Sequence, residues 1–411
     1  MRATLLNTDG STRGVDVGRT AAFARPSAPL RSRVVYAAAH VIPHAHADNT
    51  PGAPADIDWD ATLGFRRTVW GWGLGVADAM DTAQRNMGLD PPATRELITR
   101  SADAARSALK DPEIAALFGP DAQVSDLLVA GVSTDHRSEQ HLTLAEIIEA
   151  YREQLAATQA TGAGAVMMAS RHLARTADGP EDYRRVYREV LAAADEPVIL
   201  HWLGTAFDPQ LAGYFGSTDT AEAAETLLAI MSEGADQIRG VKMSLLDDDA
   251  EIAVRKRLPA GTIMLTGDDY HFAHLITGDG THGGADGEYS HALLGAFAAT
   301  PPAASAAIQA LDHGDAEACR RILEDAEPLA RHVFAAPTFH YKTGVAFLSW
   351  LNGHQRAFQM IGGMHGARSL PHLSRILELA AASGNLEDPP LAIERWHSLL
   401  HVNGISVEEA P

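Results

Sequence analysis

A lysine inside a short apolar segment is the residue of this chain best suited to covalent chemistry. Lys242 lies in the segment 238–244, which reads IRGVKMS. Only four of the 33 basic residues are lysines, so arginine is the usual positively charged surface residue of this chain. The presence of a lysine within an apolar segment therefore needs an explanation. Burial in apolar surroundings lowers the pKa of a lysine and frees its amine to attack carbonyl carbons. The segment therefore predicts a lysine nucleophile.

Two further apolar segments carry side chains that can move protons or bind a substrate. His201 lies in the segment 197–203, and the unperturbed pKa of histidine, near neutrality, suits acid and base catalysis. Asp268 and Asp269 follow the segment 263–267. We expect one of these aspartates to cap the following helix and the other to face the pocket, and we assign substrate binding to Asp268.

Other polar side chains stand at the ends of neighbouring apolar segments. They are Asp78 and Asp81 after the second segment, Thr134 and His136 after the third, and His40 after the first. Most of them accept hydrogen bonds, which suits the hydroxyl groups of a sugar-like substrate. With Lys242 and His201 as the catalytic residues, this set completes the predicted site.

The loop that begins at His40 offers a competing interpretation. Residues 40–48 read HVIPHAHAD and bring His40, His44 and His46 together in sequence. Neutral imidazoles bind divalent metals, so a metal-dependent barrel enzyme could use these histidines. However, the spacing matches no specific ligand motif, and the chain has 19 histidines. The main hypothesis therefore includes no metal or other cofactor, and a divalent metal is the alternative.

The candidate residues lie on short apolar segments that alternate with amphipathic helical stretches. The predicted strands are 34–40, 75–80, 127–132, 165–169, 197–203, 238–244, 263–267 and 292–297. Such units predict a (β/α)8 TIM barrel over residues 33–300, with the site at the C-terminal ends of the strands. Residues 1–32 are expected to form an N-terminal extension with a small hairpin, and residues 301–411 a C-terminal helical region packed on the barrel.

The acidic composition limits the partners of the chain. A formal net charge of −20 argues against nucleic acid and anionic membranes, because both need basic surfaces. The single cysteine, Cys319, excludes intrachain disulfides. No apolar run approaches the roughly 18 residues of a membrane span, and the N-terminus lacks the layout of a signal peptide. We therefore expect a cytoplasmic protein whose partner is a small carbonyl substrate. Barrels of this type with extra helices are often dimers or tetramers, so we also expect a homo-oligomer.

The order of these elements and two motifs resemble the dihydrodipicolinate synthase and N-acetylneuraminate lyase superfamily. The motifs are GVKMS around Lys242 and LTGDD at 265–269, and the helices near Asp315 and Phe339 are similar to that superfamily's C-terminal helices. The resemblance covers about residues 33–355 and is closest to a branch described as a domain of unknown function. It implies a (β/α)8 fold and class I aldolase chemistry, in which Lys242 forms a Schiff base with a 2-oxo acid, usually pyruvate.

The sequence departs from that superfamily at two places in its site. A Gly-Thr-Thr-Gly-Glu type motif there binds the substrate carboxylate, whereas residues 75–82 read GVADAMDT here. A catalytic tyrosine on the fifth strand is absent, and His201 is the residue that can take over its role. The predicted function is a Schiff-base lyase, aldolase or dehydratase acting on a small oxo acid or keto-sugar-like substrate. The alternatives are a metal-dependent lyase or isomerase and a barrel that binds a ligand without catalysis.

Overall fold

Eight parallel strands close into a barrel. The computed structural model describes residues 1–18, 23–80, 85–278 and 288–407. In barrel order the strands are β3 (Val35–Ala38), β4 (Gly75–Asp78), β5 (Leu128–Val132), β6 (Gly164–Met167), β7 (Val198–Leu203), β8 (Ile238–Ser244), β9 (Ile263–Thr266) and β10 (His291–Leu294). Each strand overlaps the segment predicted for it, so the predicted TIM barrel is confirmed.

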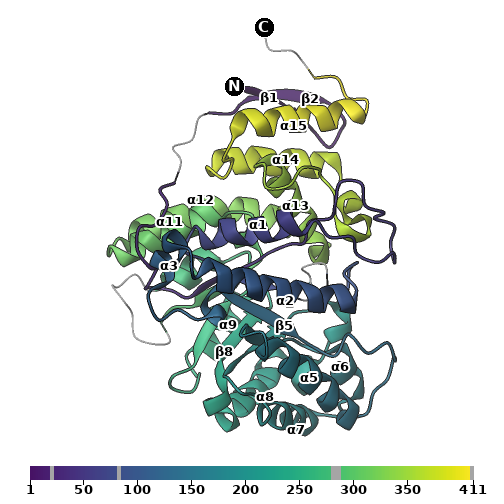
Figure 1. Ribbon diagram of the computed structural model, residues 1–411, viewed down its shortest axis with the longest axis vertical. Helices are drawn as coiled ribbons and strands as arrows, with labels where there is room; N and C mark the ends of the chain where they lie inside the picture. Colours follow the sequence, from purple (N-terminus) through teal and green to yellow (C-terminus); the bar gives the residue numbers. More distant parts are fainter. Residues whose placement is uncertain (19–22, 81–84, 279–287, 408–411) are drawn as a thin grey trace.

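Helices surround the barrel (Figure 1). They are α1 (Trp59–Trp70), α2 (Pro91–Ala108), α3 (Pro112–Phe118), α4 (Val124–Leu127), α5 (Leu144–Gln159), α6 (Arg171–Thr176), α7 (Pro180–Leu191), α8 (Thr220–Glu233), α9 (Asp248–Arg255) and α10 (Phe272–Thr277). Several begin at a side chain that accepts a hydrogen bond from the first turn, such as Asp58, Thr143 and Asp219. In the described ranges, no helix is both long and apolar enough to cross a membrane.

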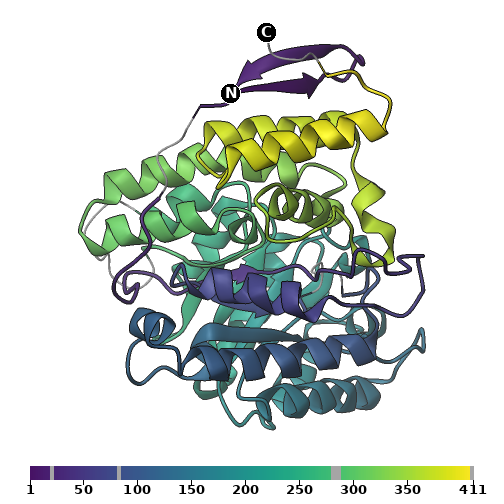
Figure 2. The ribbon, with the colours of Figure 1, turned by 45° about the horizontal axis from the view of Figure 1, so that its top comes forward.

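A helical region and a small hairpin lie together at one end of the molecule (Figures 1 and 2). The helices are α11 (Pro301–Asp312), α12 (Ala316–Val333), α13 (Tyr341–Leu351), α14 (Leu370–Ala382) and α15 (Pro389–Val402). The antiparallel strands β1 (Arg2–Leu6) and β2 (Thr12–Asp16) lie against α14 and α15, and the Trp396 indole donates a 2.7 Å hydrogen bond to the Thr4 carbonyl. The hairpin is therefore held by the C-terminal helices.

Apolar side chains from seven of the barrel strands or their ends fill the barrel interior. The cluster comprises Tyr36, Ala38, Ala77, Met80, Val129, Val166, Met168, Ile199, Leu265 and Leu293. Within the described residues, β8 contributes no member to this cluster. Gly240 pairs with Ile199 and Lys242 pairs with Leu265, and paired residues of parallel strands point to the same face. On β8 the interior position is therefore taken by Lys242.

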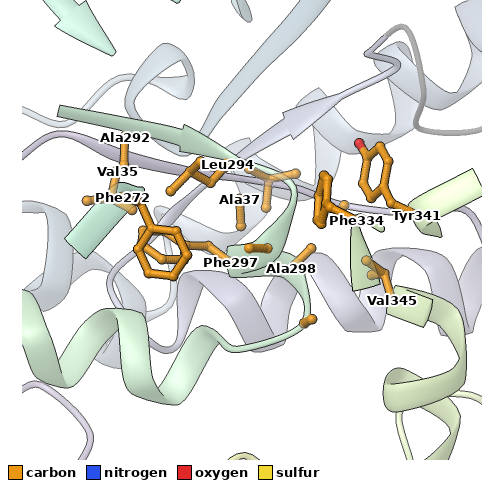
Figure 3. Close-up of a cluster of buried hydrophobic side chains, with 14 of the residues drawn as sticks. Val35, Ala37, Phe272, Ala292, Leu294, Phe297, Ala298, Phe334, Tyr341 and Val345 are labelled. Atoms are coloured by element: carbon orange, nitrogen blue, oxygen red, sulfur yellow. The ribbon is translucent and has the colours of Figure 1, made fainter. Parts of the chain in front are cut away.

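A second apolar cluster joins the C-terminal helices to the end of the barrel. Figure 3 shows Phe334 and Tyr341 near Ala37 and Leu294 from the strands. The rings of Phe334 and Tyr341 stack with their centroids 4.1 Å apart. Gly295 allows this approach, because a Cβ there would lie 2.7 Å from each ring. The first residue of α13 is therefore fixed against the end of β10.

Candidate active site

Lys242 points into the barrel from the middle of β8. Its exposed fraction is only 7%. Its register partners on the flanking strands are His201 on β7 and Leu265 on β9. Removing an amine from water costs free energy, and groups held at that cost are concentrated at functional sites. Lys242 is therefore the starting point of the candidate site.

His201 lies beside Lys242 as a neutral ring. Its Nε2 is 3.1 Å from the Ser244 hydroxyl oxygen. Burial lowers the pKa of His201 well below its usual range, and the Lys242 cation acts in the same direction. A ring with such a low pKa suits hydrogen bonding to Ser244 or a substrate better than proton transfer near neutral pH. The acid and base role assigned to His201 stays a prediction.

Asp269 approaches Lys242 from the end of β9. It is 3% exposed, and its Oδ1 accepts a 2.8 Å hydrogen bond from the Ala296 backbone N–H. Burial raises the pKa of Asp269 to about 7, against the opposing effects of that hydrogen bond and of the Lys242 and Lys342 cations. A carboxyl group with a pKa near the working pH can both accept and donate a proton. Asp269 is thus well suited to carry protons beside Lys242.

A second buried lysine reaches the same end of the barrel from α13. Lys342 is 3% exposed, and its Nζ donates a hydrogen bond to the carbonyl of Ala38, the last residue of β3. The same Nζ lies 4.9 Å from the centroid of the Tyr341 ring, within cation–π range. The stacking of Tyr341 against Phe334 fixes the backbone that carries Lys342. The C-terminal region therefore contributes a side chain to the candidate site.

His40, predicted to bind substrate, is fully buried just beyond β3. Its Nε2 lies 2.8 Å from Oε1 of Gln355, a residue that follows α13. Burial lowers the pKa of His40 to about 3, the Gln355 hydrogen bond opposes this, and the Lys342 and Arg66 cations add to it. His40 is therefore a neutral ring held by the C-terminal region near Lys342.

Thr134, predicted to bind substrate, lies at the C-terminal mouth of the barrel just beyond β5, and that role stays a prediction. It lines a cavity of about 200 Å³ over the ends of β5, β6 and β7. Its Oγ1 is 2.7 Å from the Ser170 hydroxyl oxygen. Leu203 lines the same cavity and is the register partner of Ser244. Neither Lys242 nor Asp269 lines this cavity.

Asp78, predicted to bind substrate, faces away from the barrel interior. Its neighbour Ala77 belongs to the interior cluster, so Asp78 lies on the opposite face of β4. Its two carboxylate oxygens accept hydrogen bonds of 2.6 and 3.3 Å from Arg66 of α1, and both side chains are fully buried. The prediction is corrected, because this carboxylate is neutralised by Arg66 between the barrel and α1.

Asp268, predicted to bind substrate, forms hydrogen bonds with the residues that directly follow it. One carboxylate oxygen accepts hydrogen bonds from the backbone N–H groups of Tyr270 and His271, at 2.8 and 3.1 Å, and the other lies 2.9 Å from the His271 ring. Asp268 therefore stabilises the turn before α10, and its predicted role in substrate binding stays a prediction. The neighbouring Asp269 interacts electrostatically with Lys242.

His136, another predicted substrate-binding residue, lies on the outer side of the strand ends beside α5. There its Nε2 is 2.8 Å from Glu153 and its Nδ1 is 2.7 Å from the Gln154 amide. It does not line the mouth cavity that contains Thr134. Asp81 lies outside the described residues.

The histidines of the alternative metal site are not gathered around one point. His40 is buried against Gln355. The rings of His44 and His46 stack in the following loop with their centroids 5.2 Å apart, and His46 is exposed. In the parts of the chain that the structure describes, no group of three or more His, Cys, Asp or Glu side chains is arranged to hold a metal ion. The metal-dependent alternative stays a prediction.

Replacing Gly267 with alanine should disturb Lys242 directly. The new Cβ would lie 2.1 Å from the Ser244 hydroxyl oxygen and 2.7 Å from Lys242 Cε, so these side chains would have to move. We expect the free energy of unfolding to fall by about 1–3 kcal/mol, as in other overpacked cores, and Lys242 to react more slowly. Urea denaturation and borohydride trapping measure the two effects. The control is Gly64→Ala in α1, where the added Cβ meets nothing within 4 Å, and equal behaviour of the two variants would contradict the packing argument.

The fold and the site together define a lysine-bearing (β/α)8 barrel protein with C-terminal helices. The chain belongs to the family described as "Protein of unknown function (DUF993)", whose model matches residues 3–405. A search of curated proteins finds no significant match.

Solved structures of dihydrodipicolinate synthases share this fold. The enzyme from Bacteroides thetaiotaomicron has a TM-score of 0.60 at 13% sequence identity, over 86% of this chain and 99% of that one. The enzyme from Aquifex aeolicus has a TM-score of 0.55 at 14% identity, over 92% and 100% of the two chains. A putative dihydrodipicolinate synthetase from Pseudomonas aeruginosa has a TM-score of 0.55 at 17% identity, over 86% and 98%. The resemblance inferred from the sequence is thus confirmed at the level of fold.

Sequence reasoning missed two members of the site. Lys342 carried a usable signal, because it is one of four lysines and lies in an aromatic and apolar context, HYKTGVAF at 340–347. Gln355 carried none, since its contact with His40 spans 315 residues.

Proposed function

We propose that this protein is a Schiff-base-forming lyase whose nucleophile is Lys242. The observation that carries the proposal is an amine buried in the barrel interior, together with the carboxyl group of Asp269, whose pKa is about 7 and which interacts electrostatically with that amine. A buried amine suits attack on a carbonyl carbon, and the nearby carboxyl group suits the proton transfers that follow. The resemblance to dihydrodipicolinate synthases supports the same chemistry for the lysine on the sixth strand.

The proposed reaction begins when the Lys242 amine adds to the substrate carbonyl carbon. The carbinolamine loses water after Asp269 protonates its hydroxyl group, which leaves an iminium ion. This ion takes up the electron pair of the breaking C–C bond while the Asp269 carboxylate removes the proton of the adjacent hydroxyl group. Asp269 then protonates the resulting enamine carbon, and hydrolysis restores the amine. The reverse order forms a C–C bond, and loss of a hydroxyl group instead of a carbon fragment gives a dehydratase.

The rest of the site supports a small substrate. The mouth cavity of about 200 Å³ over the ends of β5, β6 and β7 has room for a few carbon atoms, and Thr134 lines it. Neutral His201 and Ser244 can bind the substrate oxygen atoms next to the iminium carbon. We therefore propose a small oxo acid or keto-sugar-like compound as substrate. A homo-oligomeric state and a cytoplasmic location stay predictions.

Borohydride trapping tests the proposal directly. The purified chain is mixed with 2-oxo acids, ketoses and keto-sugar acids, reduced, and digested with trypsin. An adduct on Lys242 blocks cleavage there, so the peptide 240–255 should appear with the mass of the reduced substrate, because the flanking cleavage sites are Arg239 and Arg255. The compound that traps best defines the substrate class.

The other lysines provide the internal control. Lys110 and Lys256 are exposed, so adducts that also form there with equal yield mark unspecific reaction. Trapping restricted to these exposed lysines across the panel would contradict the proposed function. In that case, metal analysis of the same preparation would separate the metal-dependent enzyme from a barrel that only binds a ligand.

A further inference from the structure

The C-terminal region covers one side of the barrel mouth. Beyond β9, the Tyr270 hydroxyl group donates a 2.9 Å hydrogen bond to the Phe334 carbonyl oxygen. Beyond β4, Gly88 packs closely on Ile361, because a Cβ at Gly88 would lie 3.0 Å from the Ile361 carbonyl oxygen. The hydrogen bond of Lys342 to the end of β3 belongs to the same set. These contacts lie at the carboxyl ends of the strands, where barrel enzymes bind their substrates.

Phe339 extends this cover as far as β7. It is half-buried and lies in the segment 335–340 between α12 and α13. Phe207, a residue beyond β7, has its ring centroid 6.2 Å from those of Phe334 and Tyr341, which flank that segment. Phe207 and Phe339 also line one cavity of about 360 Å³. The C-terminal region therefore supplies part of the wall of a cavity at the barrel mouth.

This cavity presents a largely apolar lining. Its apolar lining residues are Met87, Leu203, Phe207, Pro209 and Phe339. The charged residues that line it, Arg171 and Asp208, form an ion pair with each other at 2.6 Å. Asn86 and Gln210 complete the lining. An apolar group that enters the cavity therefore gains from leaving water and leaves no charge without its partner, whereas hydroxyl groups would lose water against apolar side chains.

The apolar cavity adjoins the mouth cavity of about 200 Å³. The lining residues that both cavities share are Asn86, Arg171, Leu203 and Asp208. Leu203 is the register partner of Ser244, which lies on the same face of β8 as Lys242. Met168 lines the mouth cavity and also belongs to the interior cluster of the barrel. The mouth cavity thus extends from the barrel interior to the cavity that Phe339 lines.

We propose that Phe339 is a specificity-determining residue that favours carbonyl compounds with an apolar substituent at Lys242. This inference rests on the proposed function, in which the substrate forms a Schiff base with that amine. The bound compound extends from Lys242 toward the mouth, and its apolar substituent lies against Phe339 and Phe207. The substrate class is thereby narrowed to oxo compounds with a hydrocarbon chain or ring, and polyhydroxylated compounds of equal size bind less well.

Reductive alkylation with two aldehydes of equal size tests this inference before the natural substrate is known. Isovaleraldehyde and glyceraldehyde have the same number of non-hydrogen atoms, but the first is apolar and the second carries hydroxyl groups. Each is mixed with the chain and cyanoborohydride, and peptide mapping gives the rates at Lys242 and at the exposed Lys110. The ratio of the two rates at Lys110 corrects for the intrinsic reactivity of the aldehydes. We expect the ratio at Lys242 to favour isovaleraldehyde about tenfold more, as contacts with one or two methylene groups do in other pockets.

Four variants assign this preference to the cavity. Phe339→Ser should bring the ratio at Lys242 close to that at Lys110, whereas Phe339→Leu keeps an apolar side chain and should retain most of the preference. Met87→Ser changes the same cavity from the loop after β4 and should lower the preference as well. The control is Phe358→Ser, at a half-buried phenylalanine of the described C-terminal residues that lines neither cavity, and it should leave the ratio unchanged. Urea denaturation shows which variants remain folded.

The outcomes separate this inference from the proposed function. Equal ratios at Lys242 and Lys110 in the native chain, a ratio that neither Phe339→Ser nor Met87→Ser changes, or no alkylation of Lys242 by either aldehyde would overturn the inference. An equal loss of preference in Phe358→Ser would do the same. Trapping of a compound of the panel on Lys242 together with any of these results would leave the proposed function standing. A preference that depends on Phe339, without trapping by any compound of the panel, would support the inference and contradict the proposed function.

Discussion

Replacing Lys242 with methionine should abolish borohydride trapping and lower turnover about 10³-fold or more, while the protein stays at least as stable as the native chain. If the proposed function holds, the covalent intermediate forms on the Lys242 amine, and nucleophile removal in other enzymes costs this much or more. Activity on the compound that traps best, together with urea denaturation, measures both effects.

The expected stability of this variant comes from the cost of burying a lysine side chain. Lys242 is 7% exposed, and methionine has a similar length and no polar group. The substitution therefore removes the cost of burying an amine. Functional groups are commonly kept at the expense of stability, so a gain in stability with a loss of activity is the signature of a catalytic residue.

The matched control for this variant is Lys110→Met, which removes an exposed lysine and should change neither activity nor trapping. A structural role for Lys242 would give the reverse pattern. Methionine would then cost more than about 2 kcal/mol of unfolding free energy, as the loss of a buried partner does, while any ligand-induced effect survived. That result would favour the barrel without catalysis.

The barrel and Lys242 could be predicted from the sequence because both depend on short-range patterns. Each strand is a short apolar run, and in β8 a single lysine interrupts this run. Lys242 lies on the same face of β8 as Gly240 and Ser244, the face that points into the barrel. The alternation of side chains along a strand then fixes the direction of Lys242 once its neighbours are known.

The rest of the site depended on information that the sequence pattern does not carry. Asp78 is the last residue of β4, and Asp269 lies just beyond the end of β9. Asp78 nevertheless faces α1, whereas Asp269 interacts with Lys242 in the barrel interior. A shift of one residue decides between these faces, and the apolar runs here are too short to fix it. Lys342 approaches Ala38 across 304 residues, so its place depends on how α13 docks through Tyr341. Such long-range packing follows from the whole fold.

Breaking the Arg66–Asp78 pair should destabilise the protein more than any exposed ion pair would. Both side chains are fully buried, and Asp78→Leu would leave the Arg66 guanidinium without its carboxylate. We expect the free energy of unfolding to fall by about 3–5 kcal/mol, because the cost of the unpaired buried charge adds to the lost attraction. Urea denaturation of Asp78→Leu, Arg66→Met and the double variant measures it. The double variant should recover most of the loss, since it leaves no unpaired charge.

An exposed pair provides the control for this cycle. Arg100 and Glu96 lie 2.7 Å apart on α2 with side chains about half exposed, and Arg100→Met should cost no more than about 1 kcal/mol of unfolding free energy.

The double-variant cycle of Asp78 and Arg66 also decides between the two roles considered for Asp78. If Asp78 bound substrate, Asp78→Leu would weaken trapping on Lys242 at little cost in stability, and Arg66→Met would not rescue it. If the carboxylate only balances Arg66, the double variant should trap substrate as the native chain does, because the strand that carries Asp78 would keep its place against α1.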